Sequence, residues 1–211
     1  MRLRLIQLQL VPGILSLQRE KREFRFAQFA AASCPPVLEV KVPSRLHCDE
    51  INNFVLQRIK EIKPDVVVIA GYWLIYQVEP QRWHFDPTEL ANTVRLVQAA
   101  GAKRVVLMGQ VPTWKIAQPK IMVELFLKTN SIPERTTLHL EPKSFAINET
   151  LRPAIVDAGA TYILPSEYLC SQAGCLIQIR SEPAYFDTDH LTPMGSDLLL
   201  RHILGRLLER K

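Results

Sequence analysis

Residues 63–70 of the chain are KPDVVVIA, and this stretch decides the predicted fold. Pro64 and Asp65 end a preceding helical pattern, and five apolar residues follow without a polar interruption. A short apolar run rich in β-branched residues predicts a strand that is buried on both faces of a parallel sheet. A second such run, RVVLMG at 104–109, follows another helical pattern, so we expect strands and helices to alternate.

The flanking sequence continues this alternation. Apolar residues at helical spacing predict helices, which we place at 11–20, 48–62, 87–100, about 120–129, 143–158 and 193–209. Further strands are expected at 24–31 and 161–164, whereas 165–186 is expected to be irregular. Thr192 and Pro193 are typical of the cap and first position of a helix. We therefore predict one α/β domain over residues 1–211, with helices on both sides of a parallel sheet.

Composition excludes several classes of function. The net charge of +5 is modest and its basic residues are dispersed, so we expect no nucleic-acid partner. No apolar stretch reaches the roughly 18 residues that a membrane helix needs. Gln7 and Gln9 interrupt the apolar N-terminus, so we expect no export signal in this chain. No glycine-rich phosphate loop supports nucleotide binding, and we expect no cofactor.

Four cysteines form two pairs that are local in sequence, Cys34 with Cys48 and Cys170 with Cys175. Four cysteines allow three connectivities, so the sequence alone leaves the pairing open. The spacings do not match those of zinc sites, and we expect no metal. Two local disulfides are the favoured interpretation, and four reduced cysteines are the alternative. Disulfides would indicate an oxidising compartment such as the periplasm.

The strongest chemical signal is YFDTDHLT at 185–192, directly before the last predicted helix. Asp187 and His190 are three residues apart in a tight turn, where the carboxylate can accept a hydrogen bond from the imidazole. Such a bond fixes the tautomer of the histidine and stabilises the imidazolium that forms when it takes a proton. A pair of this kind activates a serine hydroxyl for attack on an acyl group. The neighbouring Asp189 is not included in the predicted pair.

The segment FDTDHLTPMGSDLL, residues 186–199, resembles the closing block of SGNH hydrolases, D-x-x-H-L-[ST]-x-x-G. Other segments resemble the SGNH domains of membrane O-acyltransferases. They are ASCPP at 32–36, the helix opened by Cys48, KPDVVV at 63–68, GYW at 71–73 with Tyr76, GAKRVVLMGQVP at 101–112 and YLCSQAGC at 168–175. The resemblance covers the chain from about residue 11 onward, and its specificity comes from the order of the segments.

This resemblance implies a three-layer α/β/α fold with a flavodoxin-like parallel sheet and a Ser–Asp–His acyl-transfer site. Asp187 and His190 match the family's aspartate and histidine, and both cysteine pairs would be disulfides. The implied partners are a carbohydrate acceptor, an acyl donor and a membrane acyltransferase domain. The implied location is the periplasm or the membrane surface. The implied reaction is O-acetyl transfer or ester hydrolysis on cell-envelope carbohydrate.

The chain departs from the family at its N-terminus, because no G-D-S motif occurs anywhere in it. Residues 1–10, MRLRLIQLQL, stand where the first strand and that serine belong, so we expect a truncated or replaced first strand. A gap or exposed edge would follow unless residues 3–8 fill the sheet. Ser16 lies too far into the next helix to serve as nucleophile, and residues 71–73 lack the asparagine of an oxyanion hole. We therefore predict little or no esterase or transferase activity for the chain as given.

The alternative is a module that binds a glycan or a protein partner without chemistry. Trp73, Trp83 and Trp114 would support it by lining a sugar site, although packing in the core or in loops is the favoured role for each. A nucleotide-binding flavodoxin-like domain is a weaker third hypothesis, because the phosphate loop is missing.

Overall fold

The computed structural model describes residues 2–5, 10–21, 24–42, 45–78 and 86–208. The chain forms two compact units. The sheet unit comprises residues 1–8, 22–110 and 146–163, and the second unit comprises 9–21, 111–145 and 164–211. The single domain over residues 1–211 stays a prediction.

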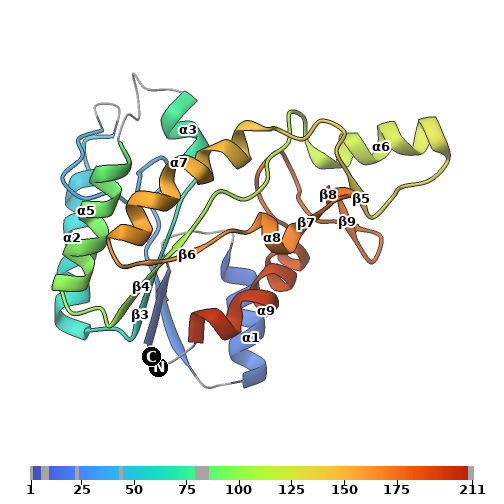
Figure 1. The fold of residues 1–211 in the computed structure, drawn as a ribbon. Coiled ribbons are helices and arrows are strands. Elements are labelled where there is room, and N and C mark those ends of the chain that lie inside the picture. Colours follow the sequence, from blue (N-terminus) through green and yellow to red (C-terminus); the bar gives the residue numbers. More distant parts are fainter. Residues whose placement is uncertain (1, 6–9, 22–23, 43–44, 79–85, 209–211) are drawn as a thin grey trace. The chain divides into compact units, whose positions relative to one another are not determined.

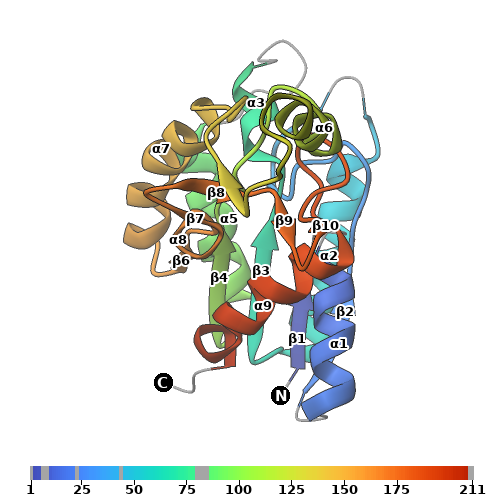
Figure 2. The same cartoon turned by 90° about the vertical axis from the view of Figure 1, so that its right-hand side faces the viewer.

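The sheet unit contains five parallel strands in the order β2-β1-β3-β4-β6 (Figure 1 and Figure 2). Their bounds are β1 (Arg2–Leu5), β2 (Arg25–Gln28), β3 (Val66–Ala70), β4 (Arg104–Met108) and β6 (Thr161–Ile163). The order matches the flavodoxin-like pattern, in which the second strand lies outside the first. The predicted parallel sheet is thus confirmed, with the 24–31 strand shortened to four residues.

Strand β1 fills the sheet position that would otherwise have been a gap or an exposed edge. Leu3 is aligned with Phe26 of β2 on one side and with Val66 of β3 on the other. The first strand is therefore present as Arg2–Leu5, although its sequence differs from the family's pattern. Residues 6–8, the rest of the segment considered for this position, lie outside the described residues.

The core of the sheet unit is apolar, as the sequence predicted. Every residue of β3 is buried, and so are Val105 to Met108 of β4. Helices pack in the same unit, namely α2 (Cys48–Ile62), α3 (Trp73–Val78), α5 (Pro87–Ala99) and most of α7 (Lys143–Asp157). Of these, only the six-residue α3 was not predicted, because it is too short to display a helical period.

Local chemistry fixes the ends of these helices. The Asp86 carboxylate accepts hydrogen bonds from the backbone N–H of Thr88 and Glu89, and the Glu89 carboxylate accepts from the Asp86 N–H, which makes a capping box. After α5, Gly101 has φ +102°, a conformation that a Cβ atom disfavours and that is common in a residue just past the end of a helix. The Cys34–Cys48 disulfide joins the loop before α2 to the first residue of that helix.

The second unit combines helices with strand segments of two or three residues. Its helices are α1 (Val11–Lys21), α6 (Gln118–Thr129), α8 (Ser166–Leu169) and α9 (Pro193–Leu208). Its strands are β5 (Arg135–Thr136), β7 (Cys170–Ser171), β8 (Gly174–Leu176), β9 (Gln178–Ile179) and β10 (Glu182–Pro183). The Cys170–Cys175 disulfide crosses between β7 and β8, so both predicted disulfides are confirmed.

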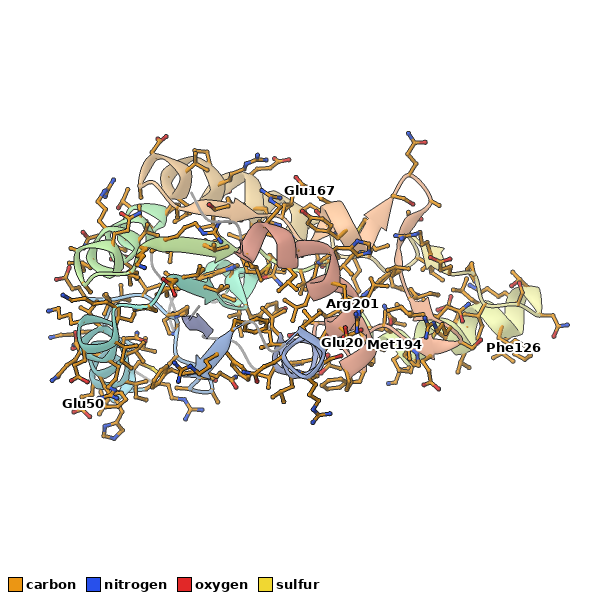
Figure 3. All side chains as sticks on the ribbon, turned by 90° about the horizontal axis from the view of Figure 1, so that it is seen from below. Glu20, Glu50, Phe126, Glu167, Met194 and Arg201 are labelled. Atoms are coloured by element: carbon orange, nitrogen blue, oxygen red, sulfur yellow. A yellow bond between two sulfur atoms is a disulfide. The ribbon has the colours of Figure 1, made fainter. Side chains whose placement is uncertain are left out.

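Helices α1 and α9 lie against each other at a glycine. The Gly13 N–H donates to Ser196 Oγ at 3.2 Å, and a Cβ added at Gly13 would lie 2.6 Å from the Ser196 carbonyl oxygen. At the surface of the same pair, Arg201 of α9 forms ion pairs with Glu20 of α1 and with Asp197, as Figure 3 shows for Arg201 and Glu20. The close approach of α1 to α9 at Gly13 is possible only for a residue without a side chain.

Within the described part of the chain, no helix has both the length and the apolar character needed to cross a bilayer.

Candidate active site

The segment that precedes α9 forms a tight closed loop in the second unit. Tyr185 and Leu191 form an isolated antiparallel bridge, and the Phe186 N–H donates to the His190 carbonyl at 3.1 Å. Thr192 then starts the helix as predicted, because its Oγ1 accepts a hydrogen bond from the Gly195 N–H at 3.2 Å. The loop thus presents residues 187–190 from a backbone that is fixed at both ends.

Asp187 and His190 are in direct contact. His190 Nδ1 lies 2.7 Å from Asp187 Oδ2, and Asp187 Oδ1 accepts hydrogen bonds from the Asp189 N–H at 2.9 Å and the His190 N–H at 2.7 Å. Partial burial opposes ionisation of this carboxyl, but these two amides and the imidazole outweigh it, so that the pKa of Asp187 is lowered. The carboxylate is therefore ionised near neutral pH.

An ionised carboxylate can only accept hydrogen bonds, so the 2.7 Å contact requires a proton on Nδ1 of His190. In the neutral imidazole this leaves Nε2 as the basic nitrogen. The side chain of His190 is 47% exposed, so a solvent-borne molecule can reach the ring. The arrangement can therefore take a proton at Nε2 and stabilise the resulting imidazolium through Asp187.

Asp189 occupies a different environment two residues away. It is 9% exposed, its Oδ1 accepts from Thr188 Oγ1 at 2.8 Å, and its Oδ2 lies 3.7 Å from His190 Nδ1. Burial raises the pKa of this carboxyl, with the Thr188 hydrogen bond acting in the opposite direction. The pKa values of the two aspartates of the loop are thus shifted in opposite directions, and Asp187 is the one that bonds the imidazole.

Ligand atoms of Asp187, Asp189 and His190 all lie within 4.8 Å of one another. Carboxylate oxygens and an imidazole nitrogen are common ligands of metal ions. However, Nδ1 of His190 carries the proton that it donates to Asp187 and has no lone pair for a metal. Coordination there would require the Asp187–His190 hydrogen bond to break. Nε2 keeps its lone pair, so the hydrogen bond to Asp187 excludes a metal only at Nδ1.

Sequence reasoning missed Gln118, which holds this loop in place. Gln118 is completely buried at the start of α6, and its N–H donates to the Asp187 carbonyl at 3.1 Å. Its side chain accepts from the Tyr185 N–H at 2.8 Å and donates to the Leu176 carbonyl at 2.9 Å. Trp114 adds a backbone bond to the Thr188 carbonyl at 2.8 Å. No local sequence signal indicates these contacts, because they join residues that are 58 to 74 positions apart.

Phe186 was also missed as a candidate, although it belongs to the quoted motif. Its ring stacks on the His190 imidazole with centroids 5.5 Å apart and an angle of 16° between the planes. The side chain is 59% exposed, which is unusual for a phenylalanine. It restricts the orientation of the imidazole and presents an aromatic surface beside it.

The remaining residues singled out in the sequence lie elsewhere. Ser16 contacts Arg201, whose guanidinium donates to its Oγ at 3.4 Å. Trp73 and Trp114 are 0% and 3% exposed, which confirms the favoured packing role for both. Trp83 lies outside the described residues.

The carboxyl end of the sheet carries a buried polar network. Asn148 Oδ1 accepts hydrogen bonds from the Gln110 N–H and from the Tyr162 hydroxyl, each at 2.7 Å. Gln110 Oε1 accepts from the Leu74 N–H at 3.0 Å, and the Trp73 indole donates to the Met108 carbonyl at 2.8 Å. These groups bond to one another, so the network fixes the ends of β3 and β4.

Comparison with solved structures supports the fold. The periplasmic domain of a lipopolysaccharide acetyltransferase from Salmonella ser. Paratyphi A superposes with a TM-score of 0.82 at 20% identity, over 99% of this chain and 84% of that chain. The aryl esterase of M. smegmatis gives 0.60 at 10% identity, over 99% and 100% of the two chains. A carbohydrate acetylesterase from Sinorhizobium meliloti gives 0.58 at 10% identity, over 97% of each chain. At these identities the likeness establishes the SGNH hydrolase fold.

A comparison with curated protein sequences finds no match. A family model is decisive instead: the model of the SGNH domain that is fused to AT3 domains matches residues 8–205, which is most of the chain. The closing block predicted from sequence, with Asp187 and His190, lies inside this range. The chain therefore belongs to the family of SGNH domains that are fused to AT3 domains.

Proposed function

We propose that this chain is an acyl-transfer domain that acts on carbohydrate of the cell envelope, with His190 as general base and acid and Asp187 as the carboxylate that orients and stabilises it. The observation that carries the proposal is the 2.7 Å contact between His190 Nδ1 and Asp187 Oδ2. The Asp187 carboxylate also accepts hydrogen bonds from two backbone amides, which favour its ionised form. Membership of the SGNH family and the likeness to an acetyltransferase domain and a carbohydrate acetylesterase support it.

The chemistry follows from the tautomer of His190. Its Nε2 takes the proton of a serine hydroxyl while the oxygen attacks the acyl carbonyl, and the imidazolium then protonates the leaving alkoxide. An acyl-serine results. The same nitrogen next deprotonates a sugar hydroxyl or a water as its oxygen attacks the acyl carbon. The ester bond to the serine breaks, and the imidazolium returns the proton to the serine oxygen, which completes transfer or hydrolysis. Asp187 stabilises the imidazolium in both halves of the reaction.

We further propose that the chain as given is impaired, because its sequence has no G-D-S motif to provide that serine. Removing the nucleophile from a triad leaves only the effects of binding and electrostatics. We expect no serine-dependent burst with an aryl acetate. A burst that a fluorophosphonate abolishes would contradict this part of the proposal.

The experiment that tests the acid–base role restores the motif. In the family the serine motif follows the first strand, and residues 6–8 follow β1 here. The triple variant Ile6→Gly, Gln7→Asp, Leu8→Ser is expected to gain a fluorophosphonate-sensitive burst with an aryl acetate. Adding His190→Ala should remove that burst, whereas adding Ser16→Ala should not. A burst that persists without His190 would refute the assigned role.

The partners and location belong to the same proposal. A membrane acyltransferase domain of the AT3 type would supply the acyl group, since the family model describes SGNH domains fused to AT3 domains. The periplasm suits both disulfides and an envelope carbohydrate. Co-purification of the chain with such a domain from membranes would test the partnership.

A second candidate function is a module that binds glycan without turnover. Two observations favour it, the missing G-D-S motif and the exposed ring of Phe186 beside His190, which offers a stacking surface to a sugar. Phe186→Ala should then weaken glycan binding, whereas Phe126→Ala, another exposed phenylalanine of the same unit (Figure 3), should not. Binding without turnover in the restored G-D-S variant would favour this candidate over the enzyme.

A further inference from the structure

A pocket of about 510 Å³ lies within the second unit, apart from the residues of the Asp187–His190 loop. We call it the hairpin pocket, because the β9–β10 hairpin forms one of its walls. Its polar and aromatic lining includes Arg135, Tyr168, Gln178, Arg180, Ser181 and His202. The volume is within the range of small-molecule sites, which is about 300–1,000 Å³.

One wall of the hairpin pocket is a fixed aromatic pair. The rings of Tyr168 and His202 stack with centroids 6.1 Å apart and an angle of 22° between the planes. Arg206 donates a hydrogen bond to the Tyr168 hydroxyl at 3.0 Å, which holds the tyrosine in this orientation. Flat rings of this kind pack against the apolar face of a ligand ring, and a sugar pyranose has such a face.

The charges of the hairpin pocket favour an anion. Its lining contains two arginines, Arg135 and Arg180, and one acidic residue, Glu134. Arg135 is occupied, since its Nη1 donates to the Leu169 carbonyl at 2.8 Å and its Nε lies 3.8 Å from Glu134. Arg180 is exposed, and across the described ranges no hydrogen bond or ion pair involves its guanidinium. Its planar donors are therefore available to a carboxylate or a phosphate.

The backbone that carries Arg180 is held in an unfavourable conformation. Ile179 pairs with Glu182, so Arg180 and Ser181 form a two-residue turn, and their φ angles are +53° and +68°. Such turns favour asparagine and glycine, because other side chains fit poorly at positive φ. Unfavourable backbone of this kind gathers at ligand sites, where the orientation of a side chain matters more than stability.

We propose that the hairpin pocket binds an anionic sugar unit, with its carboxylate or phosphate on Arg180 and its ring against the Tyr168–His202 pair. Gln178 and Ser181 provide further hydrogen-bonding groups, and Gln178 is fixed because its Nε2 donates to the Ile132 carbonyl at 2.6 Å. The proposal requires no catalysis by His190. Its failure would leave the acid–base role intact, and the reverse also holds.

The test is an NMR titration of the whole chain with four probes, namely D-glucuronate, glucose 6-phosphate, D-glucose and inorganic phosphate. We expect one of the two anionic sugars to shift the amides of residues 178–181 and the His202 ring with a Kd of about 1 mM. Glucose and phosphate should bind at least about tenfold more weakly than that anionic sugar, because glucose lacks the anionic group and phosphate lacks the sugar ring. The stronger anionic sugar distinguishes a carboxylate from a phosphate.

Variants locate the site. Arg180→Gln should weaken the anionic sugar about tenfold, whereas Arg19→Gln, an exposed arginine on α1 of the same unit, should not. The double variant Arg180→Asn, Ser181→Gly suits the turn, so its Tm should rise by about 2–4 °C while binding is lost. Glucose binding as tightly as the anionic sugars, no response to either anionic sugar, or full affinity in Arg180→Gln would each overturn the proposal.

Discussion

The sheet unit and the second unit are held together in different ways. In the sheet unit the interior of β3 and β4 consists of apolar side chains from adjacent parallel strands, and its polar network lies at the strand ends. In the second unit the strands are two or three residues long, and the Asp187–His190 loop depends on hydrogen bonds from distant residues such as Gln118. Burial of apolar area specifies a layer, whereas placing two side chains within bonding distance requires directional contacts.

The largest effect should come from the apolar core of the sheet unit. Leu107 of β4 is fully buried, so Leu107→Ala should lower the free energy of unfolding by about 2–5 kcal/mol. Leu127→Ala, at a leucine of α6 that is 78% exposed, should change it by less than about 0.5 kcal/mol. Urea unfolding measures both. Hydrogen exchange should show the loss of protection in β3 and β4 first, and equal losses from the two variants would contradict the contrast.

The next effect should come from Gln118. Gln118→Ala leaves the buried Tyr185 N–H and Leu176 carbonyl without their partner, at a total cost of about 1–3 kcal/mol. Exchange protection should fall in residues 176–190 and remain in β3 and β4. The matched control is Gln172→Ala, an exposed glutamine of the same unit. Undisturbed protection in residues 176–190 would show that the loop does not depend on Gln118.

The smallest effect concerns the two aspartates of the loop and their dependence on pH. The pKa of Asp187 is lowered from 3.8, so its contribution to stability is present above pH 3.8 and is lost as the pH falls through the folded-state pKa. Asp187→Asn should therefore cost stability at pH 7, by about 1 kcal/mol for a partly exposed pair, and nothing in strong acid. Urea unfolding between pH 2 and pH 7 would measure this difference.

Asp189 should change the pH dependence of the unfolding free energy in the opposite direction. Burial raises its pKa from 3.8, so the ionised form is penalised in the folded state and the unfolding free energy falls as the pH rises through the folded-state pKa. Asp189→Asn should remove that fall and retain the contact with Thr188. The same pH dependence in both variants would contradict the opposite environments of the two carboxyls.

The regular part of the fold was predictable because its signals are local. The run Val66–Ala70 and the helical spacing of residues 48–62 each determine an element without knowledge of the rest of the chain. The hydrogen bond between Asp187 and His190 was predictable for the same reason, since the two residues share one turn. The catalytic role of the pair stays a prediction.

The parts that escaped prediction depend on contacts between distant segments. Residues 165–186 contain four strands of two or three residues each, and such strands are too short to display a period of two. Gln118 gives no sign in the sequence that its amide bonds Leu176 and Tyr185. The β9–β10 turn was missed because Arg180 and Ser181 are atypical of a turn with positive φ angles.

The central claim is that the Asp187 carboxylate accepts a hydrogen bond from Nδ1–H of His190 and so leaves Nε2 as the basic nitrogen. Long-range ¹H–¹⁵N NMR of the imidazole, at a pH where the ring is neutral, tests this claim most directly. The account predicts a protonated Nδ1 and a bare Nε2 for His190, with the preference lost in Asp187→Ala. A protonated Nε2 in the unmodified chain, or a tautomer unchanged by that substitution, would contradict it.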